Sequence, residues 1–381
     1  MSKKSNDEIM IGVVKSFWRW IANLAVVLFL CFTILWINVA IELIPKHPKW
    51  IALGYIPPFW FILFLLPPII IYLFFRYYKR VIVLLLVYLL VFISFGDTSL
   101  VKQKSFTFPK NSSTQKLSIV ALNLRYYSFG FDEIVAAIND MKADIYLLSE
   151  NRIKPEQIAA LREKVAPKLF YMGQQESTAI ISRYPVVSFN EVNFPTRQAS
   201  LHKGNKLEKI HLNPFRSFAH AVIDVNGTNV HAISVRFIAG RSRHKTLPSI
   251  VNWGFYVLEA QQKEIAFFLD YLKKLEGPVI FGGDLNATPS SAVVKKLAEI
   301  STDLYLYDHL WGGFTFGTSF PPMTNIPSAR LDYLFAMNQV QPQYSKMLDV
   351  VISDHYPVFA EVLIPLEKKA RETSSLTSNA L

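Results

Sequence analysis

The stretch Pro278-Val279-Ile280-Phe281-Gly282-Gly283-Asp284-Leu285-Asn286 joins a short apolar run to a glycine pair and two polar side chains. The apolar residues predict a buried strand, and Gly282-Gly283 predicts that the strand ends in a turn. Asp284 and Asn286 are therefore expected at a strand end. A lone Asp-x-Asn is usually only a turn, so its meaning depends on what stands at the ends of the other strands.

Polar side chains recur at the ends of other apolar runs. Carboxylates are costly to bury unless they are paired, so several of them at strand ends need a shared purpose. A hard divalent cation such as Mg²⁺, held by oxygen ligands, would supply one, and phosphoryl chemistry commonly uses such an ion. The recurring residues are Asn123, Glu150, Asp332, Asp354 and His355.

These residues, taken in order, resemble the endonuclease/exonuclease/phosphatase superfamily, which has the DNase I-like fold. The resemblance covers about residues 115–364 and implies a four-layer αββα sandwich. It also implies an Mg²⁺-dependent hydrolase of phosphoric esters or anhydrides, with Mn²⁺ as an alternative ion. The motifs that carry it are Asn123, Ser149-Glu150, Ile181-Ser182-Arg183-Tyr184-Pro185, Gly283-Asp284-Leu285-Asn286, Arg330-Leu331-Asp332-Tyr333 and Ser353-Asp354-His355.

The resemblance implies a metal site in which Glu150 is the principal ligand. Asp354 would contribute to the metal or its bound water, and Asn123 would help to position the ion. Asn123 can also be read as an ordinary strand-end amide.

The resemblance implies a catalytic group of Asp284, Asn286, His355, Asp332 and Asn123. Asp284 would align or deprotonate the attacking water, while Asn286 and His355 would contact the substrate phosphate. Asp332 would pair with His355 and favour its charged form. The alternative for Asp332 is a structural ion pair with Arg330.

One position departs from the family pattern. The family usually places a His at the end of a middle strand, but the matching stretch here is Ser234-Val235-Arg236-Phe237. Arg236 can bind a substrate phosphate, but it is a poor proton donor because its pKa exceeds about 12. An acidic leaving group, such as a phosphate within a diphosphate, would need less proton donation. Arg236 therefore favours diphosphate over phosphodiester cleavage.

The rest of residues 117–364 alternates between strand and helix patterns. Asn226-Gly227 between two runs is typical of a hairpin. Because hairpins and crossovers are interleaved, the pattern predicts an α/β sandwich instead of a doubly wound sheet. Expected strands are 117–122, 144–148, 179–181, 219–225, 229–235, 278–281, 331–336 and 357–363, and expected helices are 131–141, 155–165 and 257–275.

The chain has 381 residues, and its 51% apolar content is high for a soluble enzyme, with the excess concentrated before residue 96. Three apolar runs, at about 21–43, 51–75 and 80–96, predict an anchor of three transmembrane segments in residues 1–96. Pro67-Pro68 lies deep in the second run, so a kinked helix or a re-entrant turn is expected there. Residues 97–116 are expected to form a linker, 117–364 the catalytic domain, and 365–381 a disordered tail.

The distribution of Lys and Arg predicts the orientation of the anchor. The first loop carries only Lys46 and Lys49, so the N-terminus and the second loop are expected inside. With three spans, the catalytic domain is then extracytoplasmic at a bacterial inner or plasma membrane; if the short third run does not cross, it is cytoplasmic. The deciding basic residues are Lys3, Lys4, Lys15, Arg19, Arg76, Lys79 and Arg80.

The net charge of +11 favours polyanionic partners without choosing among them. Basic stretches at 195–216 and 236–245 suit a phosphate clamp, an anionic lipid surface or single-stranded nucleic acid, or are simply solvated loops. The single cysteine, Cys31, excludes an internal disulfide and a thiolate zinc site.

Three functions remain open at this stage. The anchor and the catalytic domain together look like the VanJ-type teicoplanin-resistance branch, which favours a lipid-linked substrate such as a polyprenyl diphosphate. The alternatives are an extracytoplasmic nuclease acting on DNA or RNA and a sphingomyelinase-like phospholipid phosphodiesterase. A membrane scaffold without activity is disfavoured by the complete catalytic set.

Overall fold

The computed structural model allows most of the chain to be described. The described residues are 6–40, 61–95, 105–109, 112–152, 155–165, 170–172, 177–195, 201–203, 206–208, 217–239, 247–310, 312–320 and 323–366.

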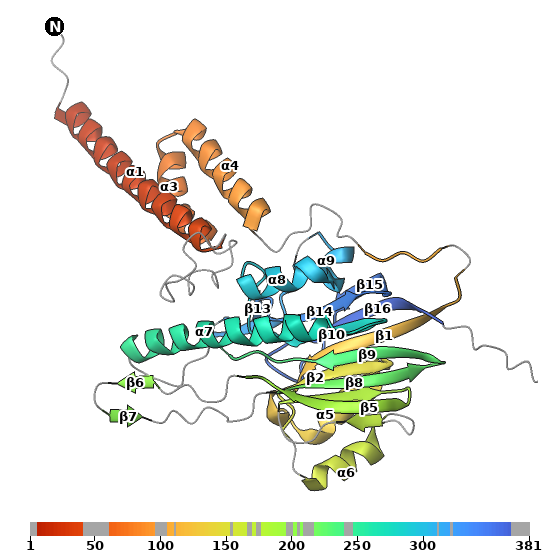
Figure 1. Ribbon diagram of the computed structural model, residues 1–381. Helices are drawn as coiled ribbons and strands as arrows, with labels where there is room; N and C mark the ends of the chain where they lie inside the picture. The colour runs from red at the N-terminus through yellow and green to blue at the C-terminus, as the bar shows by residue number, and fades with distance from the viewer. Residues whose placement is uncertain are drawn as a thin grey trace, which may run out of the picture.

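Two six-stranded mixed sheets form the centre of the domain that begins near residue 112 (Figure 1). The first has the order β15 (Gln341–Met347), β16 (Val358–Pro365), β1 (Thr114–Asn123), β2 (Ile145–Ser149), β4 (Thr178–Ser182) and β3 (Phe170–Met172). The second has the order β11 (Thr302–Asp303), β14 (Asp332–Met337), β10 (Val279–Asp284), β9 (Thr228–Ser234), β8 (Ser217–Val225) and β5 (Val186–Asn193). Two short hairpins, β6 (Leu201–Lys203) with β7 (Lys206–Glu208) and β12 (Phe316–Phe320) with β13 (Met323–Ala329), lie outside these sheets.

The alternation of side chains along β1 shows how the layers are built. Leu117, Ile119 and Ala121 pack with residues of the second sheet, so they face the space between the sheets. Val120 and Leu122 point the other way and pack with α5 (Phe131–Met141) and α6 (Pro155–Lys164). Because both faces of β1 are buried from Ile119 onward, the sequence Ile119-Val120-Ala121-Leu122 is apolar throughout.

The second sheet is covered in the same manner on its outer face. There it packs against α7 (Leu247–Leu272) and α8 (Ala292–Ile300). Figure 1 shows these two helices on one side of the sheets and α5 and α6 on the other. The domain is therefore an α/β sandwich with two helical and two sheet layers, and the expected fold class is confirmed.

The register of the strands brings polar side chains to one edge of the sandwich. Asn123 lies opposite Ser149 at the last pair of the parallel strands β1 and β2, immediately before Glu150. Asp284 lies opposite Asp332 at the last pair of β10 and β14. Residues from distant parts of the sequence therefore meet because their strands end at the same edge.

Gly282 and Gly283 allow β10 to end between close neighbours. A Cβ on Gly282 would lie 2.2 Å from the Tyr333 carbonyl oxygen, and one on Gly283 would lie 2.3 Å from that of Val235. Gly283 also has a φ of +131°, which side chains disfavour. The glycine pair is thus required by the close packing of β9, β10 and β14 just before Asp284.

The structure differs from the sequence-based expectations in a few elements. Helix α7 begins at Leu247, ten residues before the expected start at Val257. The edge strands β5 and β15 were not expected, since both are only half buried and carry too few apolar residues for a clear strand pattern. The short helix α9 (Leu304–Asp308) was also not expected; it is capped by the Asp303 side chain.

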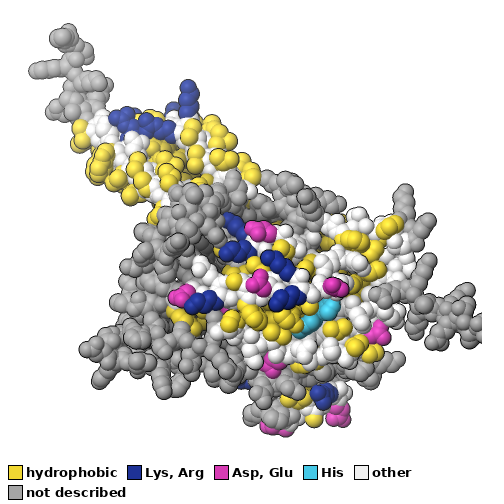
Figure 2. Space-filling view, viewed as in Figure 1, with side chains coloured by type: hydrophobic (Ala, Val, Ile, Leu, Met, Phe, Trp, Pro, Cys, Tyr) yellow, Lys and Arg dark blue, Asp and Glu magenta, His cyan; other side chains and the backbone are white. Residues whose placement is uncertain are grey.

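The N-terminal part described here contains three helices, α1 (Asn6–Ala40), α3 (Phe61–Phe74) and α4 (Tyr78–Phe95). Phe29 and Phe61 are among the side chains that pack the helices together. The outward surface is also apolar, and Figure 2 shows hydrophobic side chains over most of it, with Lys and Arg gathered at one end.

By length and composition, the stretch Met10–Leu35 of α1 is the one described segment that meets the requirements of a membrane span. It begins earlier than the expected 21–43, because the helix extends continuously through Lys15 and Arg19. Helix α3 has 14 residues and contains Pro67 and Pro68 without interruption. The first part of the second expected span, the linker up to residue 104 and the tail from residue 367 lie outside the described residues.

A buried ion pair makes a testable contribution to the domain's stability. Arg330 donates to Asp303 at 2.6 Å, both side chains are at most 2% exposed, and the guanidinium lies 4.4 Å from the Tyr333 ring centre. Arg330→Met should lower the free energy of unfolding by about 3–5 kcal/mol, because it leaves a buried carboxylate uncompensated. The measurement is denaturant unfolding followed by circular dichroism.

The matched control adds Asp303→Ser to Arg330→Met. Serine keeps a cap for α9 but removes the buried charge, so the double variant should be more stable than the single one. A double variant that is less stable would show that the burial of unpaired charge is not the cause.

Candidate active site

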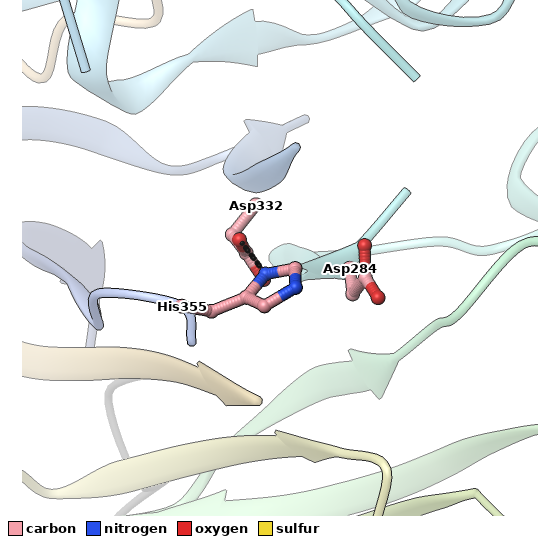
Figure 3. A group of neighbouring side chains, drawn as sticks. All are labelled: Asp284, Asp332 and His355. Atoms are coloured by element: carbon pink, nitrogen blue, oxygen red, sulfur yellow. Dashed lines mark hydrogen bonds and ion pairs between the residues drawn. The ribbon is translucent and has the colours of Figure 1, made fainter. Parts of the chain in front are cut away.

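Asp284, Asp332 and His355 form the buried centre of the site (Figure 3). Their candidate ligand atoms lie within 4.8 Å of one another. Nδ1 of His355 lies 2.6 Å from Oδ2 of Asp332, and the ring's other nitrogen faces Asp284 in Figure 3. The three side chains come from β10, β14 and the loop before β16, so the strand edge assembles them.

The carboxylates around His355 determine its charge. Burial alone would lower the pKa of the imidazole, but Asp332, Asp284 and Asp354 outweigh burial and raise it to about 9. His355 is therefore an imidazolium at neutral pH. Burial, with repulsion from Asp332, raises the pKa of Asp284, although His355 and Arg236 oppose this change. A carboxylate with a raised pKa is a stronger base, as abstraction of a proton from water requires.

Two amides fix the orientation of Asp284. Nδ2 of Asn123 donates to Oδ2 of Asp284 at 3.1 Å, and Nδ2 of Asn286 donates to the same oxygen at 2.9 Å. The backbone N–H of Asn286 donates to Oδ1 at 3.0 Å. Asn286 holds a φ of +48°, which the short Asp-x-Asn turn requires. Both expected amides therefore lie against the expected base.

Arg236 lies between the two sheets at the same edge. Its NH2 lies 2.5 Å from Oε1 of Glu150, and its Nε lies 3.5 Å from Oδ2 of Asp284. Burial opposes the charge of this guanidinium, but Asp284 and Glu150 raise its pKa above the ordinary value. The residue expected to meet a substrate phosphate is thus held by two carboxylates, one of them the expected metal ligand.

The loop after β1 contains an unusual turn that the sequence did not indicate. Three consecutive residues there have a left-handed backbone conformation, with φ values of +43° at Arg125, +53° at Tyr126 and +59° at Tyr127. The turn is held by hydrogen bonds from Arg125 N to Oδ1 of Asn123 and from Tyr126 N to the carbonyl of Glu150. We refer to residues 125–127 as the left-handed turn.

The left-handed turn adds a second arginine to the site. Nε of Arg125 lies 3.6 Å from Oδ2 of Asp354, and its guanidinium lies over the Phe129 ring. The sequence did not identify Arg125 as a site residue, because Arg125 belongs to none of the motifs. Its position two residues after Asn123 was the only available indication.

Two buried side chains of helix α7 hold the backbone next to Arg236, in residues 235–238, which we call the Arg236 segment. Gln261 donates to the carbonyls of Ile238 and Asn286, and Glu264 accepts from the Ile238 N–H. Both side chains are at most 1% exposed. These two residues are positioning residues that the sequence did not reveal, because the helical pattern alone does not show which polar side chain turns inward.

The remaining residues singled out in the sequence are Asp332, the Ser182–Pro185 segment and the two basic stretches. Asp332 pairs with His355, while Arg330 pairs with Asp303, so the alternative pairing of Asp332 with Arg330 is not found. The Ser182-Arg183-Tyr184-Pro185 segment begins opposite Ile145, at the far end of β2 from Glu150. There Arg183 pairs with Asp144 at 3.0 Å, which gives the segment a structural role. Apart from Arg236, the basic side chains of 195–216 and 236–245 lie outside the description.

The donors at this edge fit a divalent cation. Among the described residues, Asp284, Asp332 and His355 are the group whose ligand atoms lie close enough together to hold an ion, whereas the carboxylates of Glu150 and Asp354 are paired with Arg236 and Arg125. Glu150 has a φ of +52°, so the backbone turns sharply where β2 ends. Oxygen donors of this kind are what hard cations prefer.

The model of the endonuclease/exonuclease/phosphatase family matches residues 120–355. The chain belongs to this family. Its members are hydrolases that act on phosphate esters and generally use a divalent metal, in agreement with the donors described above. A search of curated proteins found no match.

Three solved structures illustrate what this chain resembles, each at less than 20% identity. A humanized D. rerio TDP2 shares 17% identity with a TM-score of 0.49, covering 65% of this chain and 98% of its own. A family member from Bacteroides vulgatus also shares 17%, with a TM-score of 0.48 and coverages of 65% and 98%. Beta toxin from Staphylococcus aureus shares 19%, with a TM-score of 0.44 and coverages of 64% and 99%.

The His355–Asp332 pair should determine how turnover depends on pH. Asp332→Asn removes the charge that keeps His355 protonated, so burial should then lower the pKa of His355 from its present value of about 9. Activity that needs the imidazolium should be lost at a lower pH than in the unchanged protein, with turnover at pH 8 reduced about 100-fold. The measurement is turnover from pH 5 to 10. An unshifted alkaline limb would show that His355 charge does not control turnover.

Proposed function

We propose that this protein is a membrane-anchored, Mg²⁺-dependent hydrolase that cleaves the diphosphate of a lipid-linked substrate, of the polyprenyl diphosphate type. The observation that carries the hydrolytic part is the buried Asp284, which faces a His355 kept charged by Asp332. A base and a cationic hydrogen-bond donor on one small site suit attack of water on phosphorus.

The residues have distinct tasks in this proposal. Asp284, oriented by Asn123 and Asn286, takes the proton from water. His355 donates a hydrogen bond to a phosphoryl oxygen from the ring nitrogen that Asp332 does not hold. Glu150 and Asp354 would hold Mg²⁺, with Mn²⁺ as a substitute, and the ion would neutralise charge on the phosphoryl oxygens.

Arg236 supports a diphosphate substrate. An arginine at the position where the family usually keeps a His can stabilise negative charge but cannot donate a proton readily. The leaving group must therefore depart as a stable anion. A phosphate leaving from a diphosphate does so far more easily than the alcohol that leaves from a phosphodiester.

The N-terminal helices support a lipid-linked substrate. Large apolar side chains of α1, α3 and α4 are exposed, among them Trp20, Phe64 and Leu90, each at least 57%. Helices that are apolar on their outer surface suit a bilayer environment. Tethering the active site to a membrane raises its effective concentration near a lipid.

Contacts within the anchor support the proposed orientation. Arg80, at the start of α4, donates to Oδ1 of Asn23 at 2.9 Å, and the Tyr72 hydroxyl donates to the same oxygen at 2.7 Å. The start of α4 therefore lies beside the middle of α1, one helical turn from Arg19, and Figure 2 shows Lys and Arg gathered at one end of these helices. In this proposal that basic end faces the cytoplasm, and α4 leads to an extracytoplasmic domain of a bacterial inner membrane.

One panel of substrates tests the activity. The full chain in detergent with Mg²⁺ should release phosphate from a polyprenyl diphosphate and leave plasmid DNA and sphingomyelin intact. Asp284→Ala should abolish the release, whereas Asp270→Ala, an exposed carboxylate of α7, should not affect it. Cleavage of DNA alone would replace the proposal with a nuclease, and cleavage of sphingomyelin alone with a phospholipid phosphodiesterase. Activity surviving in Asp284→Ala would overturn the site assignment.

The role of Arg236 in departure of the leaving group can be tested separately. Because a diphosphate needs no proton donor at position 236, Arg236→His should not increase diphosphate turnover. An increase would show that proton donation does limit the reaction.

Protease added to intact cells tests the orientation. It should remove the catalytic domain if the domain is extracytoplasmic. A variant with a protease site inserted at the exposed Asn226-Gly227 turn, cleaved after lysis, serves as the control. Resistance of that variant in intact cells would place the domain in the cytoplasm.

A further inference from the structure

Arg236 places a positive charge directly beside Glu150, the expected metal ligand, which is unusual because a cation there repels a bound metal ion. Its guanidinium bridges Glu150, which follows β2 of the first sheet, and Asp284, which ends β10 of the second. The side chains of Arg236 and Glu150 are 11% and 14% exposed, and that of Asp284 is 1% exposed. Ion pairs this well buried are weakly screened, so the arginine strongly affects the charge of both carboxylates.

The backbone on both sides of Arg236 is pinned in place. Val235 N donates to the carbonyl of Gly282, and Phe237 N donates to the carbonyl of Asp284. The carbonyl of Phe237 accepts from Asn286, and Glu264 accepts from the N–H of Ile238. Below this segment the Ser234 hydroxyl donates to the carbonyl of Leu148, which ties β9 to β2 across the two sheets. These hydrogen bonds fix the backbone of Arg236, and its guanidinium lies between the carboxylates of Glu150 and Asp284.

Two arginines already offset part of the negative charge at this edge. The Arg125 guanidinium lies beside Asp354, and the Arg236 guanidinium lies beside Glu150 and Asp284. An ion bridging Glu150 and Asp284 would meet the Arg236 guanidinium between them, so a second ion is disfavoured.

We propose that Arg236 acts as a built-in second cation, so that the site binds a single divalent ion through Glu150 and binds it more weakly than the same carboxylates would without the arginine. The inference rests on the proposed metal-dependent function and concerns its metal stoichiometry. The Arg236 contact uses Oε1 of Glu150, and the carboxylate has a second oxygen with which to hold the ion. Arg236 is then a fixed positive charge beside the phosphate, in place of a second metal ion.

The test is a Mn²⁺ titration of the full chain in detergent, followed by electron paramagnetic resonance of the free ion. The unchanged protein should bind one Mn²⁺ per chain. Arg236→Met, which removes the charge but keeps an unbranched side chain, should bind Mn²⁺ at least tenfold more tightly. Arg236→Lys, which keeps a charge, should stay within about threefold of the unchanged protein.

Arg183→Met is the matched control. Arg183 also pairs with a carboxylate, Asp144 at 3.0 Å, but at the far end of β2 from Glu150, so its loss should change the Mn²⁺ affinity less than threefold. If Arg236→Met does not fold, judged by circular dichroism, Arg236→Gln carries the same expectation.

Two results would overturn the inference: two Mn²⁺ ions bound by the unchanged protein, or no tighter binding in the neutral Arg236 variants. Because the titration uses no substrate, it is independent of the substrate panel. Hydrolysis with two bound ions would refute the inference alone, while one ion without hydrolysis of any substrate would refute the proposed function alone.

Discussion

The site depends on the burial of several carboxylates at one edge of two packed sheets. Removing a carboxylate from water costs several kcal/mol unless a cation or hydrogen-bond donors replace the solvent. Each acid here has such a partner: His355 for Asp332, Arg236 for Glu150 and Asp284, and Arg125 for Asp354. The sandwich supplies the rigid frame, because strands with both faces buried end in register where these groups meet.

The sequence predicted the residues whose position depends only on a short stretch of the chain. Asp284 and Asn286 could be predicted to act together because a strand, a glycine pair and a two-residue turn determine their geometry. Asn123 and Glu150 were found for the same reason, since each follows an apolar run. The position of Arg236 was also predicted, but its partners were not, because they lie on strands whose pairing a single sequence does not show.

What the sequence did not reveal depends on tertiary contacts. Gln261 and Glu264 look like the polar face of an amphipathic helix, yet both turn inward to hold the Arg236 segment. Arg330 stands beside Asp332 in a motif, yet pairs with Asp303 on the other side of β14. In the N-terminal part, hydropathy predicted the apolar helices, but not the Asn23 amide that joins α1 to Tyr72 and Arg80.

The left-handed turn affects how variants of Asn123 should be interpreted. Left-handed conformations cost about 1–2 kcal/mol per residue, so the turn stores conformational energy that its hydrogen bonds must hold. One of those bonds ends on Oδ1 of Asn123, whose Nδ2 also holds Asp284. A single amide thus couples the backbone of the left-handed turn to the orientation of Asp284. Truncating Asn123 would release both at once, so the lost activity would measure relaxation of the loop as well as loss of the hydrogen bond to Asp284.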